Sequence, residues 1–174
     1  MILGLDISTS IIGYTILDET NTIIECDCIR LEKFKDFFIK AKNTKNKLSN
    51  LAGKYDITAV YIEESLQAFK PGFSSAGTIQ ALSKFNGVVS WLCNEIFDLT
   101  PEYISAATAR KFCGIKVPKG EKAKRFVFNF VVDTVPEFKV EFTAKGNPIP
   151  GSFDKADSYV IARAGNVLCQ MNKK

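Results

Sequence analysis

Apolar residues near the start of the chain recur with the spacing of β-strands. A short apolar run over residues 2–7 is followed by a second run over 14–17, with Ser, Thr and Gly between them. Two such runs joined by a turn of small residues predict a β-hairpin. The stretch 22–30 alternates between apolar and polar positions and predicts a third strand.

Helical spacing alternates with strands over the next part of the chain. Residues 31–54 carry an apolar helical face, and 57–62 form a nearly continuous apolar run, as in a central strand covered on both faces. Residues 78–97 predict a long helix with apolar side chains on almost every side. Such a helix is buried by more than its own sheet, and a subunit interface is one natural cover.

The last third predicts a short strand, two helices and a long connection. Residues 102–104 form the short strand, and an apolar stripe from Glu121 onward predicts a helix. The segment 136–152 contains Pro and Gly without a clear period, so we expect mostly a mobile loop. A final helix is predicted over 153–170.

This order of elements predicts one α/β domain over residues 1–174. Three antiparallel strands followed by strand–helix alternation predict a mixed sheet flanked by helices. The hydrophobic fraction of 46% and charged fraction of 24% are those of an ordinary globular protein. No apolar run approaches the ~20 residues that span a bilayer, and the first residues already belong to a strand. We therefore expect no membrane association and no leader.

Cysteine and histidine usage narrows the chemistry. The five cysteines are odd in number and scattered, and Cys26 and Cys28 share one strand face without a second pair. This pattern disfavours zinc and favours reduced thiols in a cytoplasmic protein. The chain has no histidine, which excludes Ser–His and Cys–His catalysis and the usual zinc enzymes. Hydrolytic chemistry would need carboxylates, lysines or a carboxylate-bound metal.

Acidic residues occur within one predicted strand and at the end of another. Asp6 lies within an apolar strand, where burial of an ionised carboxylate is costly unless it is paired or binds a metal. The alternative is that Asp6 caps the turn of residues 8–10. Glu63 and Glu64 end the strand of residues 57–62, which taken alone is also typical of a solvated loop.

A second acidic pair opens the last helix. Asp154 and Asp157 are three residues apart and project to one side, although acids at a helix start are also common caps. If the first and fourth strands are parallel neighbours, Asp6 and Glu63 lie close together, and this helix lays its first turn against them. Four such carboxylates repel one another unless cations are present. Two Mg²⁺ ions about 4 Å apart suit this oxygen-rich set and can support phosphodiester hydrolysis.

Positive charge is concentrated in two segments. Residues 110–125 hold seven basic side chains against Glu121 alone, and Lys122 and Arg125 share a helix side suited to phosphates. Residues 32–54 hold seven lysines. The second group is either a solvated face or an outer phosphate contact.

Five segments together resemble a known family. In order they are ILGLDISTSIIGY, CIR, VYIEESLQAF, GEKAKRF and DKADSYVIARA. They resemble the successive motifs of the RuvC Holliday junction resolvases, and the similarity runs over nearly the whole chain. The resemblance implies an RNase H-like, five-stranded mixed sheet flanked by helices. It further implies a homodimer that binds four-way DNA junctions and nicks two strands symmetrically with two Mg²⁺ ions per active site, for which Mn²⁺ substitutes.

The resemblance also assigns roles to residues. Asp6, Glu63, Asp154 and Asp157 match the family's four catalytic and metal-binding acids. Lys122, and less closely Lys111, match its active-site lysines near the scissile phosphate. The residues expected to contact DNA are Lys111, Lys119, Lys122, Lys124, Arg125 and Phe69.

Some positions depart from the family pattern. Glu64 stands where glutamine is more familiar, Leu66 occupies an often aromatic position with Phe69 as nearest substitute, and the segment 134–152 is longer than usual. These departures bear on sequence preference and on strictness for four-way junctions, so forks and other branched DNA are alternative substrates. They suggest a divergent member, with a viral origin as one alternative.

Two other functions are compatible with parts of the sequence. The turn D-x-S/T-x-S also resembles the phosphate-binding hairpin of sugar-kinase and actin-like ATPases, which share the RNase H-like core. Those proteins enclose a nucleotide between two such domains, whereas 174 residues hold one. A DNA-binding module without catalysis is the other alternative, and the four acids argue against it.

Overall fold

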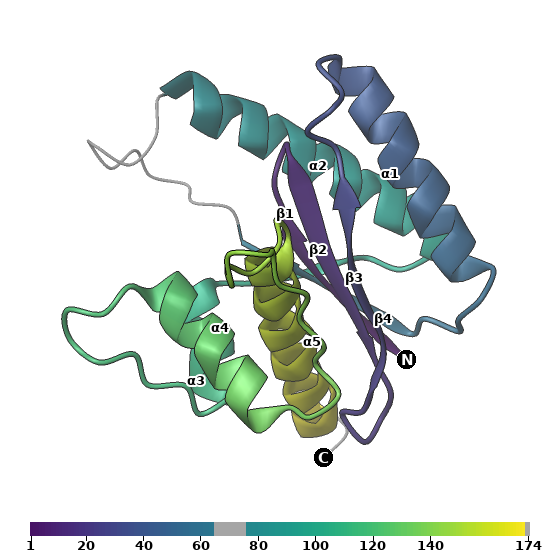
Figure 1. Ribbon diagram of the computed structural model, residues 1–174. Helices are drawn as coiled ribbons and strands as arrows, with labels where there is room; N and C mark the ends of the chain where they lie inside the picture. Colours follow the sequence, from purple (N-terminus) through teal and green to yellow (C-terminus); the bar gives the residue numbers. More distant parts are fainter. Residues whose placement is uncertain (65–75, 173–174) are drawn as a thin grey trace.

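The computed structural model describes residues 1–64 and 76–172. Its centre is one five-stranded sheet in the order β3-β2-β1-β4-β5 (Figure 1). β1 pairs antiparallel with β2, which pairs antiparallel with β3, whereas β4 and β5 run parallel to β1. The predicted mixed sheet is therefore confirmed. The strands are β1 (Ile2–Ile7), β2 (Ile11–Leu17), β3 (Ile23–Arg30), β4 (Ala59–Glu63) and β5 (Glu102–Ile104).

Helices cover both faces of this sheet. One face is covered by α1 (Phe37–Ala52) and α2 (Ala76–Phe97). The other is covered by α3 (Ala106–Phe112), α4 (Ala123–Thr134) and α5 (Ser152–Asn172), with α5 lying along the middle strands (Figure 1). Burial on both faces explains why β1 and β4 are almost continuously apolar.

Side chains along β1 alternate between the two faces of the sheet. Leu3, Leu5 and Ile7 belong to the core beneath α1 and α2, whereas Ile2 belongs to the core beneath α5. Because side chains alternate along a strand, Asp6 faces the same side as Ile2, toward α5. Tyr61 of β4 also belongs to the α5 core, which places Glu63, two residues later, on that side.

Two segments differ from the sequence prediction. The helix expected over 31–54 begins only at Phe37, because Asp36 caps it by accepting a hydrogen bond from the backbone of Ile39 at 2.8 Å. The segment 136–152, expected to be mostly a mobile loop, contains a small bridged turn instead. Its backbone bonds join Thr143 to Asn147 at 2.8 Å and Ile149 to Glu141 at 3.0 Å.

All five cysteines, each within the described residues, are free thiols, as the sequence predicts. No described helix combines the length and the apolar character needed to cross a membrane.

Candidate active site

Four carboxylates gather where the neighbouring strands β1 and β4 end. This end of the sheet is called the acidic edge below. Asp6 lies near the end of β1, and Glu63 ends β4. The two strands are parallel neighbours, with Leu5 opposite Ile62, so both acids reach the same edge. α5 begins at this edge and supplies the other two, Asp154 and Asp157.

Two glycines let α5 approach the strands closely enough. Gly13 stands opposite Asp6 in β2, and a Cβ atom there would overlap the backbone carbonyl of Asp154. Gly4 of β1 is in the same situation, because a Cβ atom would overlap the backbone of α5 at Ser158 and Ala162. The first turn of α5 can therefore rest directly on β2 beside Asp6.

The carboxylates form one electrostatic cluster. Burial raises the pKa of Asp6 well above its usual value, and the negative charges of Glu63, Asp157 and Asp154 raise it further. Burial raises the pKa of Asp157 to about 7, and burial also raises the pKa of Glu63. The cluster is thus short of positive charge at neutral pH.

Lys124 supplies part of the missing charge. Its Nζ lies 2.9 Å from Asp154 Oδ1 and 3.8 Å from Asp157 Oδ2. Burial lowers the pKa of Lys124, but the bond to Asp154 and the charges of Asp157 and Asp6 outweigh burial, so the pKa is raised overall. The first turn of α4 is in this way joined to the first turn of α5.

Lys122, the lysine matched to the family's active site, lies outside the ion pairs of the carboxylate cluster. It is the N-cap residue of α4, it is exposed, and it forms no ion pair with residues 1–64 or 76–172. Residues two apart on a helix do not face the same way, so the start of α4 at Ala123 turns Lys124 toward the acids instead. The sequence predicts Lys124 only as a DNA contact. The position at which α4 begins is the information needed to place Lys124 among the acids.

Arg110 is a second cation that the sequence did not single out. Its charge lowers the pKa of Glu63 and of Asp157 against the larger effect of burial. Its neighbour Lys111 is exposed and lines, with Arg110 and Lys116, a hollow of about 350 Å³ between α3 and the start of α4. Lys111 therefore lies beside this hollow rather than among the ion pairs of the acids.

The remaining predicted residues lie outside the cluster. Lys119 is exposed in the connection between α3 and α4, and Arg125 is exposed on α4. Phe69 and Leu66 lie outside the described residues.

The capping alternatives find less support in the structure. Ser8 closes the turn after β1, since its Oγ accepts from the backbone of Ser10 at 3.2 Å and of Ile11 at 3.0 Å. Asp6 is therefore not required to cap that turn. Asp154 is the third residue of α5, which begins at Ser152, and its carboxylate accepts from Lys124 Nζ at 2.9 Å.

The donor set fits a hard divalent cation in its chemistry. All four donors are carboxylates, and burial and mutual repulsion hold three of them at raised pKa values. Oxygen ligands with unmet negative charge are those that Mg²⁺ prefers. In the described part of the chain, however, no three acidic or cysteine side chains converge closely enough to hold a metal ion, so metal binding would require the acids to move closer together.

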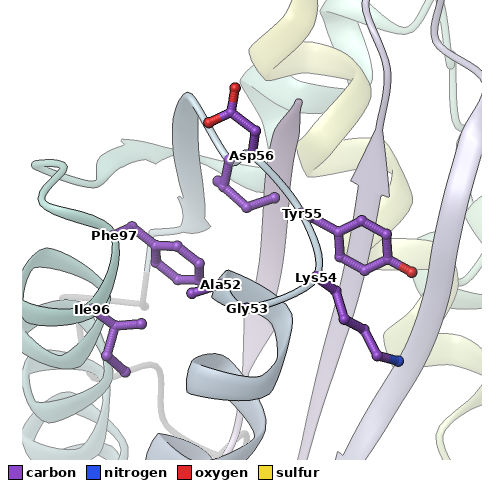
Figure 2. Close-up of a pocket in the computed structure, with 8 residues that line it drawn as sticks. Ala52, Gly53, Lys54, Tyr55, Asp56, Ile96 and Phe97 are labelled. Carbon is purple, nitrogen blue, oxygen red and sulfur yellow. The ribbon is translucent and has the colours of Figure 1, made fainter.

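Asp154 and Asp157 are partly buried, with 18% and 21% of their side chains exposed. The cavity beside Glu63 and Asp157 measures only about 20 Å³. A hollow of about 410 Å³ lies where the last turns of α1 and α2 meet the segment before β4 (Figure 2). This is the opposite edge of the sheet from the carboxyl end of β4.

Three solved structures share this architecture. T. thermophilus RuvC in complex with a Holliday junction substrate matches with a TM-score of 0.67 at 12% identity, over 98% of this chain and 94% of that one. A second Thermus thermophilus RuvC structure gives 0.65 at 15%, over 98% and 96%. The yeast mitochondrial Holliday junction resolvase Ydc2 gives 0.56 at 16%, over 99% and 80%.

These matches define the class of fold. The chain has an RNase H-like fold, with the sheet order and flanking helices described above. More particularly, it has the form of that fold found in RuvC, so the structural side of the family resemblance is confirmed. No family model matches the chain, and no curated protein matches it in sequence.

Proposed function

We propose that this chain is a divalent-metal-dependent endonuclease that resolves four-way DNA junctions. The observation that carries the proposal is the cluster of Asp6, Glu63, Asp154 and Asp157 on a RuvC-type fold. A chain without histidine has few other means of activating water for hydrolysis. The junction is the proposed substrate because similar structures are described as a RuvC–junction complex and a junction resolvase.

The four carboxylates would hold the metal, which we propose to be two Mg²⁺ ions, with Mn²⁺ as a substitute. When bound, such ions supply an activated water and stabilise the charge that develops on the phosphate. The residues of the chain prepare the site for this. Gly4 and Gly13 let α5 fix Asp154 and Asp157 beside the strands, and Lys124 neutralises part of their charge.

The cations around the acidic edge would orient the DNA. Arg110 lies close enough to influence the carboxylates, and exposed basic residues flank it on α3, α4 and their connection. Contacts from such residues to phosphates supply affinity and position without reading sequence. The proposed phosphate contacts are Lys111, Lys119, Lys122 and Arg125.

A homodimer would present two such sites to a two-fold junction. An apolar patch suitable for this assembly lies on α2 and the edge strand β5. Trp91 is 60% exposed and Tyr103 is 51% exposed, and the Tyr103 hydroxyl donates to Ser90 Oγ at 2.6 Å. Exposed aromatic residues at a sheet edge are typical of protein–protein contacts.

A cleavage assay with several DNA substrates tests the proposal. Purified protein is incubated with a four-way junction, a fork, a flap and a linear duplex of matched sequence, in Mg²⁺ and in chelator. We expect symmetric nicks in the junction that require the metal. Equal cutting of the duplex, or ATP turnover without nicking, would refute the proposal. Preference for the fork would keep the chemistry and change the substrate.

A further inference from the structure

The first turn of α1 lies at the acidic edge of the sheet, although α1 covers the face opposite α5. Leu31, which follows β3, donates a backbone hydrogen bond to Ser10 at 2.8 Å. Lys40 in α1 donates from Nζ to the backbone carbonyl of Thr9 at 2.6 Å. Both acceptors belong to the turn that follows Asp6, so the start of α1 is tied to the strand that carries the acid. Figure 1 shows α1 and α5 starting toward the same end of the sheet.

This turn of α1 presents two large apolar side chains to solvent. Phe38 is 78% exposed and Ile39 is 48% exposed. A single exposed apolar residue is common in folded proteins. Two consecutive ones beside a candidate active site form a small apolar surface that a binding partner could cover.

Among the described residues, Phe38 contacts one other aromatic ring, that of Phe37. Phe37 packs on Phe85 of α2 with ring centroids 5.5 Å apart, and it meets Phe38 edge-on at 5.6 Å. The cap from Asp36 to Ile39 fixes the backbone of the same turn. An aromatic side chain has only two rotatable bonds, so it loses little conformational freedom when it binds a partner.

Lysines outnumber acids in the segment around Phe38, where Glu32 pairs with Arg30 and Asp36 caps α1. Lys33 also lies over the ring of Phe34, 5.0 Å from its centroid. Lys33, Lys35 and Lys42 are exposed and form no ion pair with any described residue. Two other lysines of α1 are engaged within the fold, Lys45 with Glu95 at 2.9 Å and Lys47 with Glu25 at 3.2 Å. An aromatic residue among such lysines is the arrangement by which proteins stack a base and hold its phosphates.

We propose that Phe38 and Ile39 form a wedge that stacks on an unpaired base at the branch point of the DNA. The proposal rests on the proposed function, since it requires a branched DNA substrate. Bases within a duplex are already stacked, so an exposed ring gains most where a base has lost its neighbour. Lys33, Lys35 and Lys42 then contact the phosphates beside that base. The wedge favours branched over linear DNA without reading sequence.

The test compares Phe38→Ala and Phe38→Trp with Met171→Ala, a control at an exposed apolar side chain near the end of α5. Binding to a four-way junction and to a linear duplex of equal length is titrated in chelator. A 2-aminopurine base at the branch reports stacking by its fluorescence, and melting temperature and light scattering follow fold and assembly.

We expect Phe38→Ala to weaken junction binding roughly 5- to 150-fold, the worth of one stacked base, and to change duplex binding little. The fluorescence change at the branch should disappear. Phe38→Trp should keep both effects, and Met171→Ala should match the wild type.

Three outcomes would overturn the wedge. They are wild-type junction binding by Phe38→Ala, an equal loss on junction and duplex, or a fall in the mass of the assembly, which would make this surface a contact between copies. The binding tests contain no metal, so they stand apart from cleavage. A wild type that never nicks would refute the proposed function, whereas a nicking enzyme indifferent to Phe38→Ala would refute the wedge alone.

Discussion

Lys124 stands among the carboxylates where a cation is needed. Its ammonium group contacts Asp154 and Asp157, and it is 55% exposed. A metal ion bound by the same acids would compete with it for their negative charge.

Lys124→Met should therefore raise the affinity for Mg²⁺. We expect a gain of about fivefold, since a half-exposed ion pair is worth about 1 kcal/mol. The measurement is the rise in melting temperature with Mg²⁺ concentration. Lys122→Met is the matched control and should behave as the wild type. If Lys122→Met changed the metal response and Lys124→Met did not, the lysine matched by sequence would be the one that acts on the site.

The raised pKa of Asp157 makes stability depend on pH. Its pKa is about 7 in the folded protein and ~3.9 in an unfolded chain, so the folded state holds the proton more tightly between these values. Stability without metal should fall as pH rises from about 4 to about 7, and Asp6 and Glu63 should act in the same direction. Glu25, whose pKa is lowered, acts only in more acidic solution.

Asp157→Asn removes one of these titrating groups. Melting curves in chelator from pH 5 to 8 should show a smaller loss of stability for this variant than for the wild type. Identical pH profiles for the two proteins would mean that the pKa of Asp157 is not raised in the folded protein.

The structure brings the four predicted acids together, whereas it places Lys122 outside their ion pairs. Asp6 is anomalous in an apolar strand, and Asp154 and Asp157 share a helix side, so the sequence marked them as candidates and left capping as the alternative. Lys122 is the N-cap of α4 and Lys124 lies in its first turn, so the two side chains point in different directions. Helix starts are set by local capping and packing, which a motif match does not contain.

Among the helices and strands, α5 determines where Asp154 and Asp157 lie relative to the sheet. It rests on β2 through Gly13, where no side chain separates the strand from the backbone of Asp154. The same contact makes the geometry of the site sensitive to one methyl group.

Gly13→Ala should displace the start of α5 and lower both stability and activity. We expect a loss of about 1–3 kcal/mol, as for other overpacked sites, and a smaller melting response to Mg²⁺. Gly53→Ala is the control, because a Cβ atom there makes only ordinary contacts of 3.6 and 3.7 Å. A Gly13→Ala protein with wild-type melting in both chelator and Mg²⁺ would contradict this role.

Element types followed from the sequence more readily than element details. Strands and helices have distinct apolar periods, so the sheet and its long helices were predicted. The small bridged turn within 136–152 is made by backbone hydrogen bonds, such as that from Ile149 to Glu141, and these leave no apolar period. The early start predicted for α1 was wrong because Asp36 ends the irregular segment after β3.

At the scale of the whole molecule, the proposed assembly depends on one apolar patch. The order of strands and helices predicted a mixed sheet flanked by helices, and the family resemblance implied that its fold is RNase H-like. The sequence does not show which partner covers an exposed surface, because the same apolar helix can be buried in a core or in an interface.

Trp91→Glu should convert the proposed dimer to a monomer. The side chain is exposed in the single chain, so folding should survive, whereas a buried charge at an interface should prevent association. Light scattering with and without junction DNA measures the mass, and Met171→Glu is the control. A wild type that is monomeric under both conditions, or a Trp91→Glu protein of dimeric mass, would contradict the assembly.

The central claim is that the carboxylates at the edge of the sheet hold the metal for DNA cleavage. Asp154→Asn tests it directly, because asparagine caps a helix about as well as aspartate but removes one charge from the cluster. Nicking of a four-way junction in Mg²⁺ is measured beside junction binding in Ca²⁺. We predict that nicking falls by orders of magnitude while binding survives through phosphate contacts elsewhere. A variant that nicks the junction at the wild-type rate would contradict the account.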